Sequence, residues 1–298
     1  MKKDRLPTYI KNREKLNFKV PSLFNNDSIM FNLLSVCDLY GIKIPISQVY
    51  GSIKNSWNSG RMSKIREFDE QYARDIIKKY NKFGIGVAFT FTKYNITEDM
   101  LDDKVANTML KIASEEDFNY AIVSSDLLVD YIRAEYPNIK LESSLLKPTY
   151  EYKDYSEKPS YYDELAKKFD KVMIRPEFGQ DYKYLKQIKN KAKIDILINS
   201  NCVYKCPYSI AHYDRANMLE NEEIPLNTIM CNSIVCDKVS LQQNNLLSND
   251  YIDKLIKLGY INYKIAGRNI NPLSLLYLLG TYIFDGSGVY AHILNVLP

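Results

Sequence analysis

Four of the five cysteines lie in one short stretch in the last third of the chain. Their pattern is Cys202-x3-Cys206, then 24 residues, then Cys231-x4-Cys236. Four thiolates that meet in space make a soft-metal site, suited to Zn²⁺ or to an iron–sulphur cluster. Zinc ribbons usually have about two to four residues within a ligand pair, so these gaps fit zinc loosely. We expect a metal-binding segment at residues 199–240, with a 4Fe–4S cluster favoured and zinc as the alternative.

Other reactive side chains are few. Cys37 lies within the apolar run NLLSVCDLYG and is expected to be a core residue. His212 follows the first cysteine pair and fits a structural or a functional role equally well. A radical-SAM motif would need a third cysteine where Ser209 stands. With His212 and His292 the only histidines, no Ser–His–Asp or Cys–His hydrolase arrangement is visible.

Several charged residues stand where predicted strands end. Arg175 and Glu177 form either part of a site or a structural ion pair. Lys264 is expected to bind an anion, to act as an acid–base group with a lowered pKa, or only to neutralise Glu177. Arg268 offers a planar fork for a carboxylate or phosphate. These four residues and His212 are the candidate catalytic set.

The elements that must position these residues alternate along the chain. Short β-rich runs are followed, almost every time, by longer amphipathic runs, which indicates a parallel sheet. Eight such units favour closure into a TIM-like (β/α) barrel, whose carboxyl-end loops carry the site. A doubly wound open sheet is the alternative fold, and the lack of a G-x-G-x-x-G after the first strand disfavours dinucleotide binding. The expected strands are residues 17–22, 46–50, 84–92, 120–123, 139–143, 171–175, 194–198 and 261–265.

The helices are predicted from capping residues and apolar spacing. Asp27 is expected to cap a helix ending at Leu39, and Thr97 to open one ending near residue 112. Pro272 is expected to start the last long helix, with residues 273–284 buried. The polar, Pro-flanked stretch at residues 147–160 is expected to be a loop.

Composition bounds the class of protein. The 298 residues are 46% hydrophobic, which suits one large-cored barrel domain over residues 1–298. A net charge of +4 from dispersed basic residues favours solvated helix faces over a nucleic-acid surface. The N-terminus lacks the apolar core of a signal peptide, and no run is long enough to cross a bilayer. We expect a cytoplasmic protein with no membrane partner.

Three local features resemble the collagenase-like U-32 peptidase family. They are the strand–helix–strand run MIRPEFGQDYKYLKQIKNKAKIDILINSNC, the four cysteines that follow, and KIAGR at residues 264–268, which is similar to the family's Lys-Ile-Glu-Gly-Arg signature. The segment VYGSIKNSWNSGR is also similar to relatives of that family. The resemblance implies a barrel, a 4Fe–4S cluster on four cysteines, and oxygen-independent hydroxylation of an RNA base or a ubiquinone precursor, with prephenate as oxygen donor.

Two departures separate the chain from that pattern. The family's Glu-x-Phe-x-x-Gly-x-x-Cys signature is replaced by ILINSNCVYKC, and Ala266 stands where the second signature has Glu. The expected function is therefore an iron–sulphur enzyme of this hydroxylase type, with a small-molecule or nucleic-acid-derived substrate carrying an anionic group. The alternatives are a zinc-dependent hydrolase and a non-catalytic, metal-stabilised subunit of a homo- or hetero-oligomer.

Overall fold

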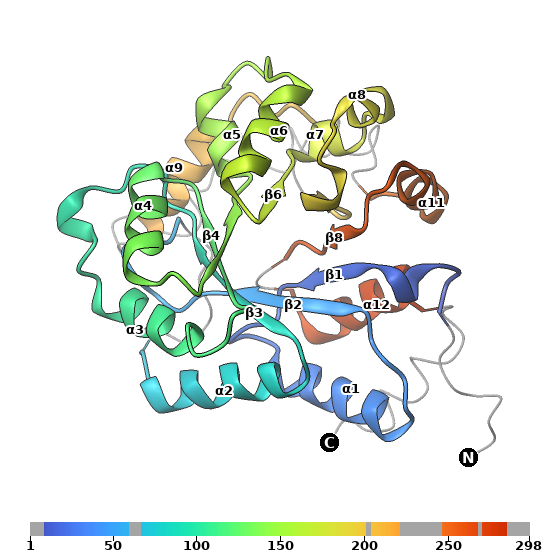
Figure 1. Ribbon diagram of the computed structural model, residues 1–298, viewed down its shortest axis with the longest axis horizontal. Helices are drawn as coiled ribbons and strands as arrows, with labels where there is room; N and C mark the ends of the chain where they lie inside the picture. The colour runs from blue at the N-terminus through green and yellow to red at the C-terminus, as the bar shows by residue number, and fades with distance from the viewer. Residues whose placement is uncertain (1–8, 60–66, 201–203, 221–245, 268–269, 285–298) are drawn as a thin grey trace.

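Eight short parallel strands close into a barrel in chain order (Figure 1). The computed structural model describes residues 9–59, 67–200, 204–220, 246–267 and 270–284. Every strand predicted from the sequence is present, so the prediction of a TIM-like barrel is confirmed. The strands are β1 (Asn17–Val20), β2 (Ile46–Gly51), β3 (Gly86–Phe91), β4 (Tyr120–Val123), β5 (Lys140–Ser143), β6 (Lys171–Met173), β7 (Ile194–Leu197) and β8 (Asn262–Lys264).

Closure depends on β1, which pairs with β2 on one side and with β8 on the other. In this last pairing Lys19 stands opposite Lys264. Successive side chains of a strand point to opposite faces. Phe18 and Tyr263 therefore join the core between strands and helices, while Lys19 and Lys264 face the barrel interior.

Helices surround the barrel and supply the other half of that core. Several begin at a polar cap, as where the Ser125 hydroxyl accepts a hydrogen bond from the Leu128 amide. The helices are α1 (Asp27–Leu39), α2 (Glu70–Lys82), α3 (Lys104–Ala113), α4 (Asp126–Glu135), α5 (Leu146–Glu151), α6 (Pro159–Lys168), α7 (Pro176–Gly179), α8 (Tyr182–Gln187), α9 (Ser209–Glu220), α11 (Asn249–Leu258) and α12 (Pro272–Tyr282).

Some helix predictions need correction. Thr97 precedes only a single 3-10 turn, and α3 starts later because the Asp103 carboxylate accepts from the Ala106 amide. The helix expected from Asp27 is present, but Asn26 is the residue that precedes it. The segment expected to be a loop contains α5, which is held by ion pairs from the buried Lys147 to Asp126 and Glu151, both at 2.9 Å.

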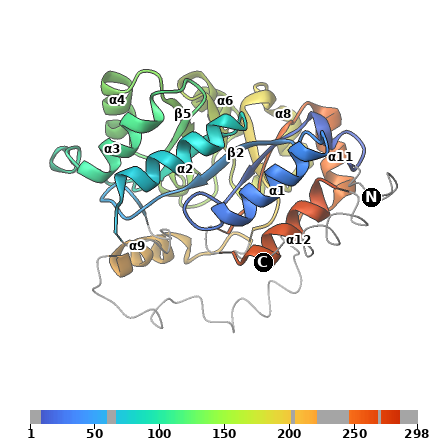
Figure 2. The ribbon, with the colours of Figure 1, turned by 90° about the horizontal axis from the view of Figure 1, so that it is seen from below.

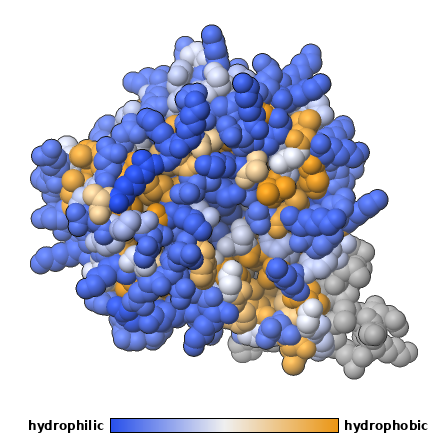
Figure 3. All heavy atoms as spheres, in the orientation of Figure 1, coloured by the Kyte–Doolittle hydropathy of each residue, from blue (hydrophilic) through white to orange (hydrophobic). Residues whose placement is uncertain are grey.

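The last helix begins at Pro272 as predicted, but it is only partly buried. Leu273 and Tyr277 are 58% and 62% exposed, whereas Leu275 and Leu279 are fully buried. Figure 2 shows α12 and α9 on the same side of the barrel. No helix in the described part of the chain is long and apolar enough to cross a membrane. The face seen in Figure 3 is mostly hydrophilic, with apolar patches between the charged side chains.

Candidate active site

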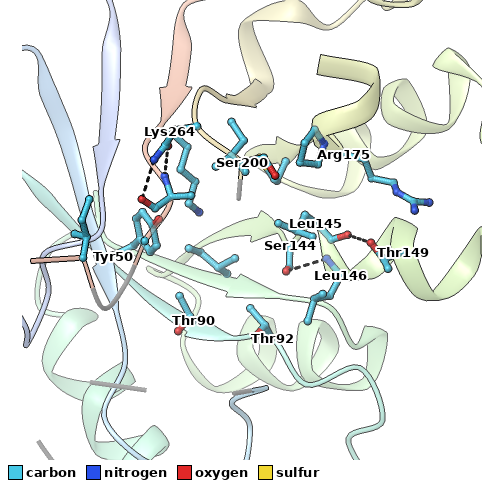
Figure 4. A pocket seen from close by; sticks show the side chains of 18 of the residues that line it. Tyr50, Thr90, Thr92, Ser144, Leu145, Leu146, Thr149, Arg175, Ser200 and Lys264 are labelled. Atoms are coloured by element: carbon cyan, nitrogen blue, oxygen red, sulfur yellow. Dashed lines mark hydrogen bonds between the residues drawn. The ribbon is translucent and has the colours of Figure 1, made fainter. Parts of the chain in front are cut away.

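A cavity of about 1090 Å³ lies over the carboxyl ends of the strands. Loops at this end converge from many strands, which is why barrels place their chemistry there. The walls are mainly apolar and come from α5, the loop after β6, and α12. The polar residues that line the cavity are Tyr50, Ser59, Thr90, Thr92, Ser144, Thr149, Tyr155, Arg175, Glu177, Asn199, Ser200, Cys206, Ser209, Tyr213, Lys264, Ser274 and Tyr277 (Figure 4).

Beneath this cavity four charged side chains meet inside the barrel. The Lys19 Nζ lies 2.7 Å from Glu142 Oε2 and 2.5 Å from Asp195 Oδ2. The Lys264 Nζ lies 2.9 Å from Glu142 Oε1, so one carboxylate bridges two ammonium groups. All four residues are at most 7% exposed. We call these four residues the charged quartet; their charges balance, as buried charges must.

Burial and neighbouring charge shift the pKa values of the quartet. Burial alone would raise the pKa of Glu142, but the two lysines lower it well below its usual range. Burial raises the pKa of Asp195 against the attraction of Lys19. Burial alone would lower the pKa of Lys19, but the neighbouring carboxylates of Asp195 and Glu142 raise it. Burial, with the charge of Lys19, lowers the pKa of Lys264 despite the attraction of Glu142.

Lys264 is the member of the quartet that reaches the cavity. Its Nζ lies 4.2 Å from the centre of the Tyr50 ring, whose hydroxyl donates to the Ile265 carbonyl at 2.5 Å. Two further polar groups on the wall, the hydroxyls of Ser59 and Thr92, are buried and have no hydrogen-bond partner among the described residues.

Arg175 borders the cavity, but its guanidinium points away from Lys264 (Figure 4). The guanidinium carbon lies 3.6 Å from the centre of the Tyr155 ring, and Nη1 donates to the Tyr152 carbonyl at 2.8 Å. The same Nη1 lies 3.3 Å from Glu157 Oε1, and Nε lies 3.9 Å from Glu177 Oε2. The ion pair between Arg175 and Glu177, one of the two roles expected from the sequence, is present within a network that fixes the loop between α5 and α6.

The cysteine segment is only partly described. Cys206 is half-buried and lines the cavity, His212 lies on α9, and Cys37 is buried in the core as predicted. Arg268 and three of the four clustered cysteines, Cys202, Cys231 and Cys236, lie outside the described residues. The convergence of the four cysteines on one metal site therefore stays a prediction. No group of three or more potential metal ligands occurs among the residues that the structure describes.

Two members of the quartet were not singled out from the sequence. The ion pair of Lys264 is with Glu142 rather than with Glu177, because β8 closes beside β1 and faces β5 across the barrel. Lys19 and Asp195 each stand between apolar residues in a short strand, in FKV and IDI. In a barrel such a residue must face inward, and this signal would have found both.

No protein-family model matches the chain, and no curated protein does. Among solved structures, a U32 peptidase matches 85% of this chain and 93% of its own, with a TM-score of 0.51 and 9% sequence identity. The endo-1,4-beta-mannanase from Rhizomucor miehei matches 93% of this chain and 94% of its own, with a TM-score of 0.41 and 7% identity. The first likeness agrees in fold with the resemblance seen in the sequence.

Proposed function

We propose that the chain is a barrel enzyme that holds a 4Fe–4S cluster on Cys202, Cys206, Cys231 and Cys236 and carries out oxygen-independent hydroxylation. The observation that carries the proposal is that Cys206 lines the same cavity as Lys264. A thiol and an ammonium group thus border one chamber at the end of a barrel where chemistry is expected.

The ends of the cysteine segment support this placement. Ser200 and Leu246 both line the cavity, and Asn199 pairs with Leu246 in an antiparallel bridge. Cys202 follows Ser200 by two positions in the sequence, and Cys206 by six. The donor set fits the cluster, because four thiolates are its usual ligands. When bound, the cluster would supply electron transfer or a Lewis-acidic iron.

The chain's own residues bind and orient the substrate in this proposal. Apolar walls exclude water, and Ser59 and Thr92 add polar side chains to the wall. Lys264 places a positive charge at the floor. A small molecule with an apolar body and an oxygen-rich end, or one nucleobase, suits a cavity of about 1090 Å³.

Anaerobic metal and sulphide analysis tests the proposal. We expect iron and sulphide in equal amounts with brownish absorbance, lost or reduced in Cys206→Ala and kept in Cys37→Ala, whose thiol is buried away from the cavity. Stoichiometric zinc would instead support the zinc-dependent hydrolase. Metal that stabilises the fold, in a protein that turns over no candidate substrate, would support a non-catalytic subunit. After anaerobic reconstitution, absence of any metal would contradict all three.

A further inference from the structure

Lys264 differs from the other described lysines in the position of its side chain. It is the only lysine among the described residues that lines the cavity. Its side chain is 9% exposed, and its Nζ packs against the Tyr50 ring. Lys264 therefore borders a chamber large enough for a small molecule, with its Nζ held between Glu142 and the Tyr50 ring.

We infer that Lys264 is a nucleophilic amine that forms an imine with the carbonyl group of a small aldehyde or ketone bound in the cavity. Lysine becomes a nucleophile when it is desolvated or stands near a second cation. Both conditions are met, because Lys264 is buried and Lys19 shares the carboxylate of Glu142. This step is independent of any metal and goes beyond the proposed hydroxylation.

The surrounding charges determine which lysine gives up its proton. Lys19 is held by Glu142 and Asp195 together, and both raise its pKa. Lys264 has the Glu142 carboxylate alone at hydrogen-bond distance within the quartet, and burial lowers its pKa. Glu142 and the Tyr50 ring face also favour the ammonium form of Lys264, but less than two carboxylates favour that of Lys19. Of the two amines, Lys264 is thus the one that loses its proton more easily.

Glu142 supplies the proton transfers that imine formation needs. It takes a proton from the Lys264 ammonium, and the neutral nitrogen attacks the carbonyl carbon. The oxygen takes up that proton, and Glu142 then removes a second proton from nitrogen. Glu142 then gives this proton to the hydroxyl group on the former carbonyl carbon. Water leaves as the C=N bond forms. The balance is ammonium plus carbonyl compound giving iminium plus water, and Glu142 ends as a carboxylate beside the iminium.

The lining residues indicate the class of carbonyl compound. Polar side chains on the wall, among them Ser59 and Thr92, suit a molecule that carries some oxygen atoms beside its carbonyl group. Leu145, Met173 and Leu197 form part of the apolar wall. An aldehyde or ketone with an apolar remainder is therefore favoured over a fully polar sugar phosphate.

Reductive trapping of the wild-type protein tests the inference. Acetaldehyde, cyclohexanone and phenylpyruvate would each be added at limiting concentration, followed by borohydride, and the modified lysines mapped by peptide mass spectrometry. The exposed Lys254 on α11 is the internal reference. We expect Lys264 to be labelled about tenfold more than Lys254 with at least one probe. Labelling no greater than that of Lys254 with all three probes would overturn the inference.

Two variants make the assignment specific. Lys264→Arg keeps the positive charge beside Glu142 but has no primary amine, so the preferential label should disappear. Lys19→Arg keeps the second cation and should leave the label on Lys264. If the Lys264→Arg protein is still labelled above the Lys254 reference as much as the wild type is, the reactive amine is elsewhere and the inference fails. The read-out is the mass of one peptide, so it can succeed in metal-free protein even if the proposed cluster function fails.

Discussion

The guanidinium carbon of Arg175 lies 3.6 Å from the centre of the Tyr155 ring. This stacking joins the residue that precedes α7 to the loop between α5 and α6, and it covers the face of a cation that also contacts Glu157. A planar guanidinium can stack on the ring and donate several hydrogen bonds in its plane, whereas a lysine ammonium has no planar group to do so.

Arg175→Lys should therefore destabilise the protein while keeping its charge. We expect the free energy of unfolding to fall by about 1–3 kcal/mol, as measured by urea denaturation. The matched control is Arg133→Lys on α4, whose parent residue is exposed. If Arg175 serves mainly to hold a substrate anion, stability would be unchanged and only ligand binding would weaken.

Removing the shared carboxylate of the charged quartet should cost more. Glu142→Gln leaves Lys264 buried without its anionic partner, and we expect a loss of about 3–5 kcal/mol in unfolding free energy. Glu164→Gln, which breaks an ion pair to Lys167 with both side chains about two-thirds exposed, should change it by less than about 1 kcal/mol. The double variant Glu142→Gln/Lys264→Met should recover part of the loss, and no recovery would contradict the role of Lys264 as the unpaired charge.

Asp27 should make stability depend on pH. Burial raises its pKa to about 6 from the usual 3.8, although the Tyr80 hydroxyl donates to it at 2.9 Å. The folded protein therefore keeps this proton to higher pH than the unfolded chain does. The contribution of Asp27 to the free energy of unfolding therefore falls as pH rises from about 4 to about 6, where the folded carboxyl ionises at a cost.

Asp27→Asn removes this ionisation and keeps an oxygen that accepts from Tyr80. Relative to wild type, the variant should gain about 1–3 kcal/mol between pH 4 and pH 7, as followed by denaturant titration at each pH. A difference between the two proteins that does not vary with pH would show that Asp27 ionises at its usual pKa.

Cys37 should be dispensable. Its side chain is buried on the apolar face of α1, and burial raises the pKa of its thiol to about 11. Cys37→Ala should lower the unfolding free energy by about 1 kcal/mol and leave metal content unchanged. In the native protein the thiol should resist alkylation at pH 8. Loss of metal in this variant would mean that Cys37 is a ligand.

The barrel could be predicted from local patterns in the sequence. Runs such as GVAFTF and YAIV are apolar enough to be strands covered on both faces, and polar caps with apolar spacing indicated the helices between them. The sequence also showed that Arg175 and Lys264 stand at strand ends. These are local signals, because each depends on residues within one segment.

The pairing of the buried charges, in contrast, depends on how the barrel closes. Lys19 and Asp195 are 176 positions apart, and Lys264 and Glu142 are 122 apart. Their pairing follows from closure of β8 on β1 and from the inward direction of alternate side chains, and neither is visible in a single segment. The same closure placed Cys206 and Lys264 around one cavity, because parallel strands all end on the same side of the barrel.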